Sequence, residues 1–243
     1  MHKKFSKINV KFQKDKRVNQ KVKKAQENSY ELWGKHVSSG MLLYPNETLT
    51  RYIYAHRREF KSVLDFGCGD GRHLEMMARA GIEHIIGVDY NRSVLDVAQQ
   101  RCQKYNIKCD LYQNNQNQKL NELISDEIDC VVCFGITLCN AHYVTSDMFK
   151  QFASVLKNGG KVFANWRAQD DSLYGNGKEI EKDTFIIERD SHKGMLYYIP
   201  NLDDIKAIYK DAELEIISID SEKFTTGNGA IINSWLVIEA KKI

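Results

Sequence analysis

Closely spaced glycines and aspartates are the residues whose types and spacing first point to chemistry in this 243-residue sequence. The segment "VLDFGCGDG" contains Asp65, Gly67, Cys68, Gly69, Asp70 and Gly71. Glycines at this spacing let bare backbone approach a ligand closely. Asp89 follows twenty residues after Gly69, at the end of the apolar run "IIGVD". Together these residues predict a binding loop with carboxylates beside it.

The glycine spacing differs from that of a dinucleotide-binding loop, which usually reads GxGxxG and faces a pyrophosphate. Here the spacing is GxGxG, and carboxylates at Asp65 and Asp70 would repel a pyrophosphate. They favour a ligand that carries positive charge. A carboxylate at Asp89 can accept hydrogen bonds from both hydroxyls of a ribose. S-adenosylmethionine fits this pattern, because it has a ribose, a sulfonium and an ammonium group but no phosphate.

The elements that must position these residues alternate along the chain. Apolar runs predict strands over residues 62–67, 85–90, 107–113, 128–135 and 161–166. Helices are predicted after a cap at Asn46 or Thr48, over 72–80, over 93–106 with Ser93 as cap, and over 146–160 with two glycines at the end. This alternation predicts a doubly wound α/β fold, with a mostly parallel sheet and helices on both of its faces.

After residue 166 the pattern changes. A two-stranded hairpin is predicted over 183–200, a helix over 201–212 with Asn201 as cap, and two final strands over 214–220 and 232–240. We expect one domain over 26–243. Its parts are a lid region (26–58), a cofactor-binding core (59–166), a substrate-side hairpin insertion (167–200), and a C-terminal helix with strands (201–243).

The first 25 residues are predicted to be a flexible basic segment. Residues 1–24 hold ten Lys or Arg and one acidic residue, which leaves 25 basic and 31 acidic residues in the rest. Such a segment can bind nucleic acid, fold back on the acidic body or remain solvated. No apolar run is long enough for a membrane span. The six cysteines are interpreted as reduced thiols of a cytoplasmic protein. Cys130 and Cys133 form a CxxC inside a strand, so no metal site is predicted.

The segments "VLDFGCGDGRHLEMMARAG", "IIGVDYN" and "VLKNGGKVFANW" resemble the class I S-adenosylmethionine-dependent methyltransferases over residues 61–166. The resemblance implies a seven-stranded sheet with a reversed C-terminal β-hairpin. It also implies S-adenosylmethionine as cofactor and S-adenosylhomocysteine as product. The insertions are most similar to those of bacterial small-molecule and sugar methyltransferases.

The resemblance implies roles for individual cofactor-site residues. Asp65 would orient the methionyl amine directly or through water, in a loop that includes Gly67, Cys68, Gly69 and Asp70. Asp89 would hold the ribose hydroxyls, and Tyr90 would lie against the adenine. The family usually has an acid after the third strand, where this chain reads "YQNNQNQ". Asn114 or Asn115 is expected to contact the adenine instead. Phe134 and Gly135 would line the methyl side.

The acceptor is expected over the ends of the fourth and fifth strands. His142 is a candidate base, with a helix-cap role as the alternative. Arg167 would bind a carboxylate or phosphate, or form a surface ion pair. Asp170 is a further catalytic candidate. The expected substrate-binding residues are Trp33, Tyr44, Trp166, Arg167, Asp171 and Tyr174. Trp33 and Tyr44, with Tyr30, would form a lid or pack as core, whereas His192 is expected to be exposed.

Three functions follow as hypotheses. The first is methyl transfer by direct displacement to a small polar acceptor, with a sugar or nucleotide-sugar as one candidate. The second is an RNA or protein methyltransferase that holds its substrate with the basic segment. The third is a non-enzymatic relative, which the intact Asp65, Gly67, Gly69 and Asp89 disfavour.

Overall fold

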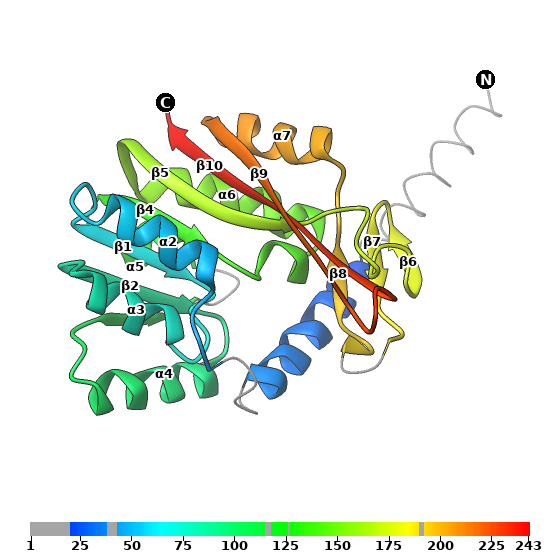
Figure 1. The fold of residues 1–243 in the computed structure, drawn as a ribbon, viewed down its shortest axis with the longest axis horizontal. Helices are drawn as coiled ribbons and strands as arrows, with labels where there is room; N and C mark the ends of the chain where they lie inside the picture. Colours follow the sequence, from blue (N-terminus) through cyan, green and yellow to red (C-terminus); the bar gives the residue numbers. More distant parts are fainter. Residues whose placement is uncertain (1–19, 38–42, 115–117, 126, 190–191) are drawn as a thin grey trace, which may run out of the picture.

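A computed structural model describes residues 20–37, 43–114, 118–125, 127–189 and 192–243 (Figure 1). The main sheet consists of β1 (Ser62–Phe66), β2 (His84–Asp89), β3 (Asp110–Gln113), β4 (Ile128–Cys133), β5 (Leu156–Arg167), β9 (Leu214–Thr226) and β10 (Ile231–Lys242). The strand order is β3-β2-β1-β4-β5-β10-β9. The first five strands pair in parallel, and β10 pairs antiparallel with both β5 and β9. The predicted fold class is confirmed.

Helices cover both faces of this sheet. They are α2 (Glu47–His56), α3 (Arg72–Ala80), α4 (Arg92–Lys104), α5 (Leu120–Leu123), α6 (His142–Val155) and α7 (Leu202–Asp211). One apolar core contains side chains of α5, α6 and α7, and the other contains side chains of α2, α3 and α4. Because successive strand residues face opposite sides, Cys130 and Cys133 lie in different cores. These two thiols therefore cannot share a metal ion.

A small second sheet lies where a two-stranded hairpin was predicted. It is antiparallel, in the order β6 (Lys178–Glu181), β7 (Thr184–Ile186) and β8 (Leu196–Tyr198). The segment "KEIE" of β6 is largely exposed and polar, so its sequence lacks the apolar signal of a strand. Pairing with β7 decides its conformation. The β9–β10 hairpin reaches from α7 toward this second sheet (Figure 1).

Several element boundaries differ from those predicted. Asn91, not Ser93, caps α4, because its side chain accepts from the Ser93 backbone N–H. α6 begins at His142 and ends at Val155, so Gly159 and Gly160 lie in β5. Gly159 has a φ of +74°, and a Cβ on Gly160 would lie 2.8 Å from the Lys157 carbonyl oxygen. The glycine pair thus permits the irregular start of β5 rather than ending a helix.

The chain is helical over residues 20–37, which we call the N-terminal helix. Residues 20–25 were predicted in the flexible segment, but Val22 is only 1% exposed. Two buried polar side chains hold the helix in place. Gln26 Nε2 donates to the Cys139 carbonyl (2.9 Å), Gln26 Oε1 accepts from the Ala141 N–H (2.6 Å), and Ser29 Oγ accepts from the Leu196 N–H (3.1 Å). The remainder of the predicted basic segment, residues 1–19, lies outside the described residues.

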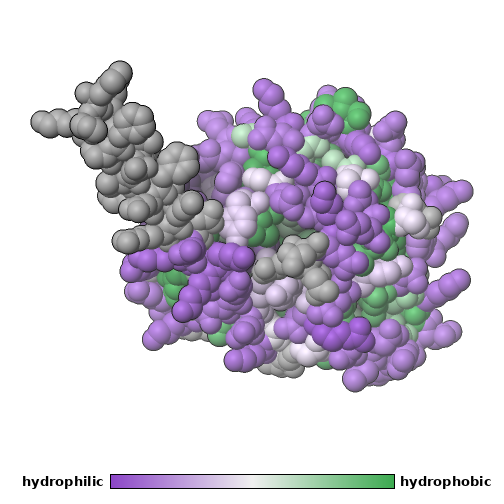
Figure 2. All heavy atoms as spheres, turned by 180° about the vertical axis from the view of Figure 1, so that it is seen from behind, coloured by the Kyte–Doolittle hydropathy of each residue, from purple (hydrophilic) through white to green (hydrophobic). Residues whose placement is uncertain are grey.

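The outer surface is mainly hydrophilic. Figure 2 shows purple side chains over most of one face, with apolar side chains visible between them. Within the described ranges, every helix is too short or too polar to cross a bilayer. Across the same ranges, no group of three or more His, Cys, Asp or Glu side chains is arranged to hold a metal ion.

Candidate active site

The glycine loop after β1 exposes its backbone at the carboxyl edge of the sheet. Gly67, Gly69 and Gly71 have φ values of +76°, +56° and +80°, a region that favours glycine. The N–H groups of Gly67 and Cys68 donate to the Val88 carbonyl, at 2.7 and 3.0 Å. A Cβ on Gly67 would lie 2.2 Å from a side-chain carbon of Ile136. The loop therefore requires glycine for both conformation and space.

Asp89, the last residue of β2, fixes the same loop from the neighbouring strand. Its carboxylate accepts from the N–H groups of Gly69 (3.0 Å) and Asn91 (2.9 Å). Burial raises the pKa of Asp89 above its ordinary value, and the backbone donors oppose that shift. These two bonds leave lone pairs on both oxygens for further donors. Asp89 borders the cavity described below.

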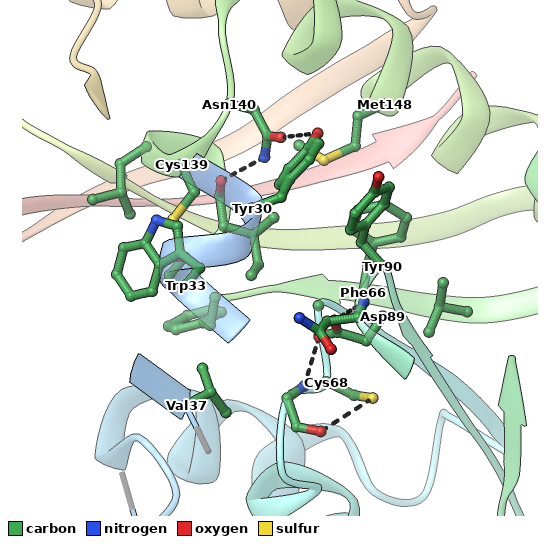
Figure 3. A pocket seen from close by; sticks show the side chains of 18 of the residues that line it. Tyr30, Trp33, Val37, Phe66, Cys68, Asp89, Tyr90, Cys139, Asn140 and Met148 are labelled. Carbon is green, nitrogen blue, oxygen red and sulfur yellow. Dashed lines mark hydrogen bonds between the residues drawn. The ribbon is translucent and has the colours of Figure 1, made fainter. Parts of the chain in front are cut away.

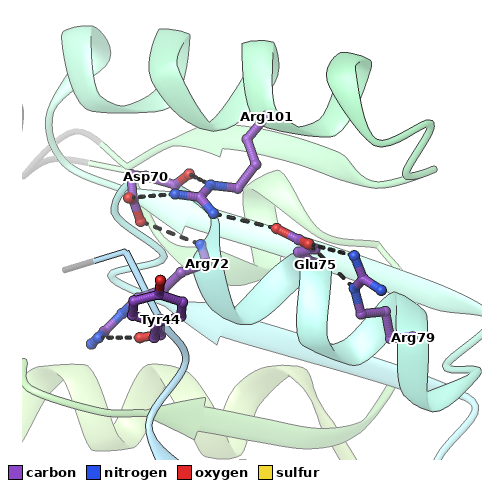
Figure 4. Close-up of polar contacts among 6 residues, drawn as sticks. All are labelled: Tyr44, Asp70, Arg72, Glu75, Arg79 and Arg101. Carbon is purple, nitrogen blue, oxygen red and sulfur yellow. Dashed lines mark hydrogen bonds and ion pairs between the residues drawn. The ribbon is translucent and has the colours of Figure 1, made fainter. Parts of the chain in front are cut away.

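Asp70 forms an ion pair within the fold (Figure 4). Arg101 reaches it from α4 with Nη2 2.8 Å from the carboxylate, and Arg101 Nη1 lies 3.3 Å from Glu75. Arg101 Nε also donates to the Asp70 carbonyl (2.9 Å). The charge of Asp70 is thus matched by Arg101, so it does not supply the free negative charge that was predicted for a cationic ligand.

Asp65 lies behind the glycine loop and is 1% exposed. Its Oδ2 lies 3.5 Å from Nδ1 of His73, and this oxygen has no hydrogen-bond partner among the described residues. His73 Nε2 accepts from the Asn46 N–H (3.3 Å), and His73 borders the cavity. Asp65 itself is not one of the lining residues. Contact with a ligand would therefore run through water or through His73, a residue that sequence reasoning did not identify.

A cavity of about 940 Å³ opens over the carboxyl ends of the parallel strands, where the strand order reverses between β1 and β4. Figure 3 shows Phe66, Cys68, Asp89 and Tyr90 converging on it with side chains of the N-terminal helix. The predicted cofactor residues that line it are Gly67, Cys68, Gly69, Asp70, Asp89, Tyr90, Asn114, Phe134 and Gly135. Of the two asparagine candidates, Asn115 lies outside the described residues.

The N-terminal helix closes one side of this cavity. The Tyr30 ring stacks on Tyr90 with 4.4 Å between centroids, and the Tyr30 hydroxyl donates to Asn140 Oδ1 (2.8 Å). Gly34 packs against the loop after β2, because a Cβ there would lie 1.9 Å from Asn91 Nδ2. Trp33, a predicted substrate-binding residue, also lines the cavity. The helix therefore touches both the loop after β2 and the loop after β4.

Aromatic and basic side chains gather at the other end of the cavity. Arg167, at the end of β5, has its guanidinium 4.0 Å from the Trp235 ring centroid and pairs with Asp171. The Tyr197 ring stacks on Trp33 at 6.1 Å, and its hydroxyl is 2.5 Å from His192 Nδ1. Except for Asp171, all of these residues line the cavity.

Several predicted acceptor residues lie elsewhere. His142 is exposed and bonds to the Tyr198 hydroxyl (2.8 Å), and Asp170 forms a surface ion pair with Lys223 (2.7 Å). Trp166 is fully buried in the core and donates to the Tyr209 hydroxyl (3.2 Å). None of the three lines the cavity. Their positions do not support the catalytic and binding roles that were predicted for them.

Three further residues that were predicted to bind the acceptor also do not line the cavity. The Tyr44 side chain is 81% exposed, and its carbonyl accepts from Arg72. Tyr174 donates its hydroxyl to Asp183 (2.8 Å). The Asp171 carboxylate accepts from the N–H groups of Leu173 and Ser234 (both 2.8 Å) in addition to Arg167. Asp171 thus orients Arg167 instead of facing a ligand.

The structure adds residues that sequence reasoning missed. His192 was expected to be exposed, but it lines the cavity together with His36, Tyr197 and Trp235. These four come from the N-terminal helix, the turn before β8, β8 itself and β10, so no local motif links them.

Comparison with known proteins agrees with this geometry. Residues 63–160 match a family model described as "Methyltransferase domain". A S-adenosylmethionine-dependent methyltransferase from Methanosarcina mazei is 20% identical, with 83% of this chain and 99% of that chain covered and a TM-score of 0.65. One from Clostridium acetobutylicum is 17% identical, with 79% and 90% covered and a TM-score of 0.62.

A third solved structure contains ligands. It is 1,6-didemethyltoxoflavin-N1-methyltransferase from Burkholderia thailandensis with 1,6-didemethyltoxoflavin and S-adenosylhomocysteine bound. It is 16% identical, with 81% of this chain and 77% of that chain covered and a TM-score of 0.59. A comparison with curated protein sequences gave no match. The resemblance to class I methyltransferases is confirmed by the domain match and the shared fold.

Proposed function

Starting from a methyltransferase domain in the class I fold, we propose that this chain transfers a methyl group from S-adenosylmethionine to a small-molecule acceptor. The observation that carries the proposal is the cavity at the strand-order reversal, which joins the glycine loop after β1 to Asp89 at the end of β2. Ligands of doubly wound sheets bind at this place in the fold. The structurally similar enzymes named above support the choice of cofactor.

The residues at this end of the cavity fit the cofactor. The lone pairs of Asp89 that face neither Gly69 nor Asn91 would accept from the ribose hydroxyls. The buried Oδ2 of Asp65 has no hydrogen-bond partner among the described residues, and it would attract the amino group of the methionine part through His73 or water. Tyr90 and Asn114 would contact the adenine. The bound cofactor supplies an activated methyl group, so the protein must mainly align the acceptor and exclude water.

A small-molecule acceptor is favoured by the enclosure of the other end of the cavity. Trp33, Arg167, Tyr197 and Trp235 surround it, and they come from four separate segments. A volume of about 940 Å³ is at the upper end of the range for small-molecule sites. It therefore has room for a cofactor and a compact acceptor together.

Calorimetric titration of S-adenosylmethionine tests this proposal. We expect binding to the wild type and a loss of about 1–3 kcal/mol for Asp89→Ala, because ribose hydroxyls would lose their acceptor. Asp110→Ala is the matched control, since that carboxylate begins β3 at the opposite edge and pairs with His84 at 3.1 Å. Absence of binding to the wild type, or equal losses for both variants, would refute the proposed cofactor site.

A further inference from the structure

The acceptor end of the cavity, around Trp33, Arg167, His192, Tyr197 and Trp235, combines aromatic rings with basic side chains. The inference drawn from it rests on the proposed function. We propose that the acceptor is a planar aromatic molecule with an ionisable hydroxyl group, and that His192 accepts the proton of that hydroxyl during methyl transfer. Trp33, Tyr197 and Trp235 provide aromatic surfaces, while Arg167 and His192 provide polar groups at the same end.

Two donors at this end lack partners. Nε1 of Trp33 and Nε of Arg167 are buried, and neither has a hydrogen-bond acceptor among the described residues. Buried donors without partners are rare, and each calls for an explanation. Both belong to side chains that line the cavity. The two nitrogens themselves have almost no exposed surface, but the Arg167 guanidinium borders the cavity, so an acceptor that carries an oxygen anion would place negative charge beside that cation.

The same end offers little for a sugar. Recognition of several hydroxyls requires several free carboxylate or amide oxygens. Asp170 faces outward to Lys223, and Asp171 accepts from Arg167, Leu173 and Ser234. Both carboxylates are thus unavailable. Glu222, opposite Trp235 on β9, and Asn165 also border the cavity. The three aromatic rings of Trp33, Tyr197 and Trp235 nevertheless favour a flat ring over a polyol.

His192 is placed to take the proton. Its Nδ1 lies 2.5 Å from the Tyr197 hydroxyl oxygen. In the tautomer that the proposal requires, Nδ1–H donates to that oxygen, which leaves Nε2 unprotonated as the proton acceptor. The surrounding charges are Arg167 on β5, His36 on the N-terminal helix, Arg189, and the opposing Asp171. Burial lowers the pKa of His192, and the three basic neighbours lower it further, so the imidazole is neutral at neutral pH. A bound phenolate beside the His192 imidazole would favour the protonated imidazolium, because opposite charges attract.

The step balances without any other reactant. The acceptor O–H gives its proton to His192 Nε2, and the oxygen lone pair forms the new O–CH₃ bond. The pair of the broken S–CH₃ bond stays on sulfur, which becomes a neutral thioether. The imidazolium then releases its proton to water.

The test uses 4-nitrophenol as the probe, because its anion absorbs visible light and its neutral form does not. The dye is titrated into wild-type protein saturated with S-adenosylhomocysteine, from about pH 5 to pH 8. We expect the ratio of anionic to neutral dye to be about tenfold higher for the bound dye than for the free dye at the same pH, the equivalent of one pKa unit. Titration in buffers of different ionisation enthalpy should show that the proton stays in the site.

Three variants separate the roles of these residues. In His192→Asn, the absorbance of the bound dye should show little excess anion. Any anion that still forms should release its proton to the buffer instead of keeping it in the site. Tyr197→Phe keeps the ring on Trp33 but should weaken the effect several-fold, because it removes the hydroxyl that orients His192. His142→Asn is the matched control, since it breaks a similar histidine–tyrosine pair outside the cavity and should change nothing. Unchanged affinity for S-adenosylhomocysteine shows that each variant is folded.

Three results would overturn the inference: no dye binding to the loaded wild type, bound dye that stays neutral, or equal behaviour of His192→Asn and wild type. If S-adenosylhomocysteine binds but the dye does not, the proposed function stands and only this inference fails. If neither S-adenosylhomocysteine nor S-adenosylmethionine binds, the proposed function fails, and dye ionisation in the unloaded protein still tests the acceptor end.

Discussion

Asp89 performs two tasks with one carboxylate. It accepts from the N–H groups of Gly69 and Asn91, which fixes the glycine loop and begins α4, and it also faces the cavity. Burial is the main cause of its raised pKa. The same group that shapes the loop is therefore sensitive to acid at a higher pH than an ordinary aspartate.

This sensitivity predicts the pH dependence of cofactor binding. Protonation of Asp89 turns one acceptor oxygen into a hydroxyl, so the affinity for S-adenosylmethionine should fall as the pH decreases through the raised pKa. Because the pKa lies above the ordinary value, the fall should begin at a higher pH than that of an unperturbed aspartate. Asp89→Asn should bind about tenfold more weakly, with little further change.

Calorimetry of wild type and Asp89→Asn over the acidic range measures this effect, with circular dichroism as the check for unfolding. An equal acid-induced loss of affinity in both proteins would assign the dependence to another group.

At the residue scale, the sequence pointed to the side chains that line the cavity around the glycine loop, but not to those around His192. Asp65, Gly67, Gly69 and Asp89 belong to local motifs at the ends of adjacent strands. The sequence therefore predicts that they lie close together. His192 lies in the polar segment "SHKG", which has the pattern of an exposed turn. Only its contact with Tyr197 and the N-terminal helix makes it a lining residue, and no local pattern encodes that contact.

The N-terminal helix is the element that joins the two ends of the cavity. Its Tyr30 stacks on Tyr90 near the proposed cofactor end, and its Trp33 stacks on Tyr197 near the proposed acceptor end. The sequence did not predict where it begins, because Lys21, Lys23 and Lys24 continue the basic run of the preceding residues. The strands were predicted better, since their apolar residues are buried on both faces, as in β4.

Gly34→Ala tests the fit of this helix. Alanine favours a helix over glycine by up to about 1 kcal/mol, so any loss must come from contact. A Cβ on Gly34 would lie 1.9 Å from Asn91 Nδ2, so either the Asn91 side chain would leave its capping position on α4 or the helix would move away from the loop after β2. We expect the affinity for S-adenosylmethionine to fall about tenfold. Calorimetry should show this loss for Gly34→Ala and none for the exposed neighbour Lys35→Ala.

The whole molecule has an uneven charge distribution. The ten basic residues within positions 1–24 precede a body with six more acidic than basic residues. A protein that holds RNA with this segment should depend on it for binding, with a steep loss in salt. The enclosed cavity instead favours an acceptor that needs no such segment.

Deletion of residues 1–19 distinguishes these two functions. We expect the shortened protein to bind S-adenosylmethionine and 4-nitrophenol within about twofold of the full chain, because among the described residues the cavity lining begins at Lys23. Titrations at low and moderate salt measure this. A large loss of affinity for a mixed RNA probe, together with retained cofactor binding, would favour the nucleic-acid function.

The attachment of the N-terminal helix also bears on how the protein is made. Gln26 bonds to Cys139 and Ala141, and Ser29 bonds to Leu196, across separations of 113, 115 and 167 residues. Contacts so distant in sequence form slowly. On the ribosome, this helix leaves the exit tunnel long before its partners are synthesised. The ligand cavity is therefore completed late in folding, when this helix docks onto segments that lie 113 to 167 residues later in the chain.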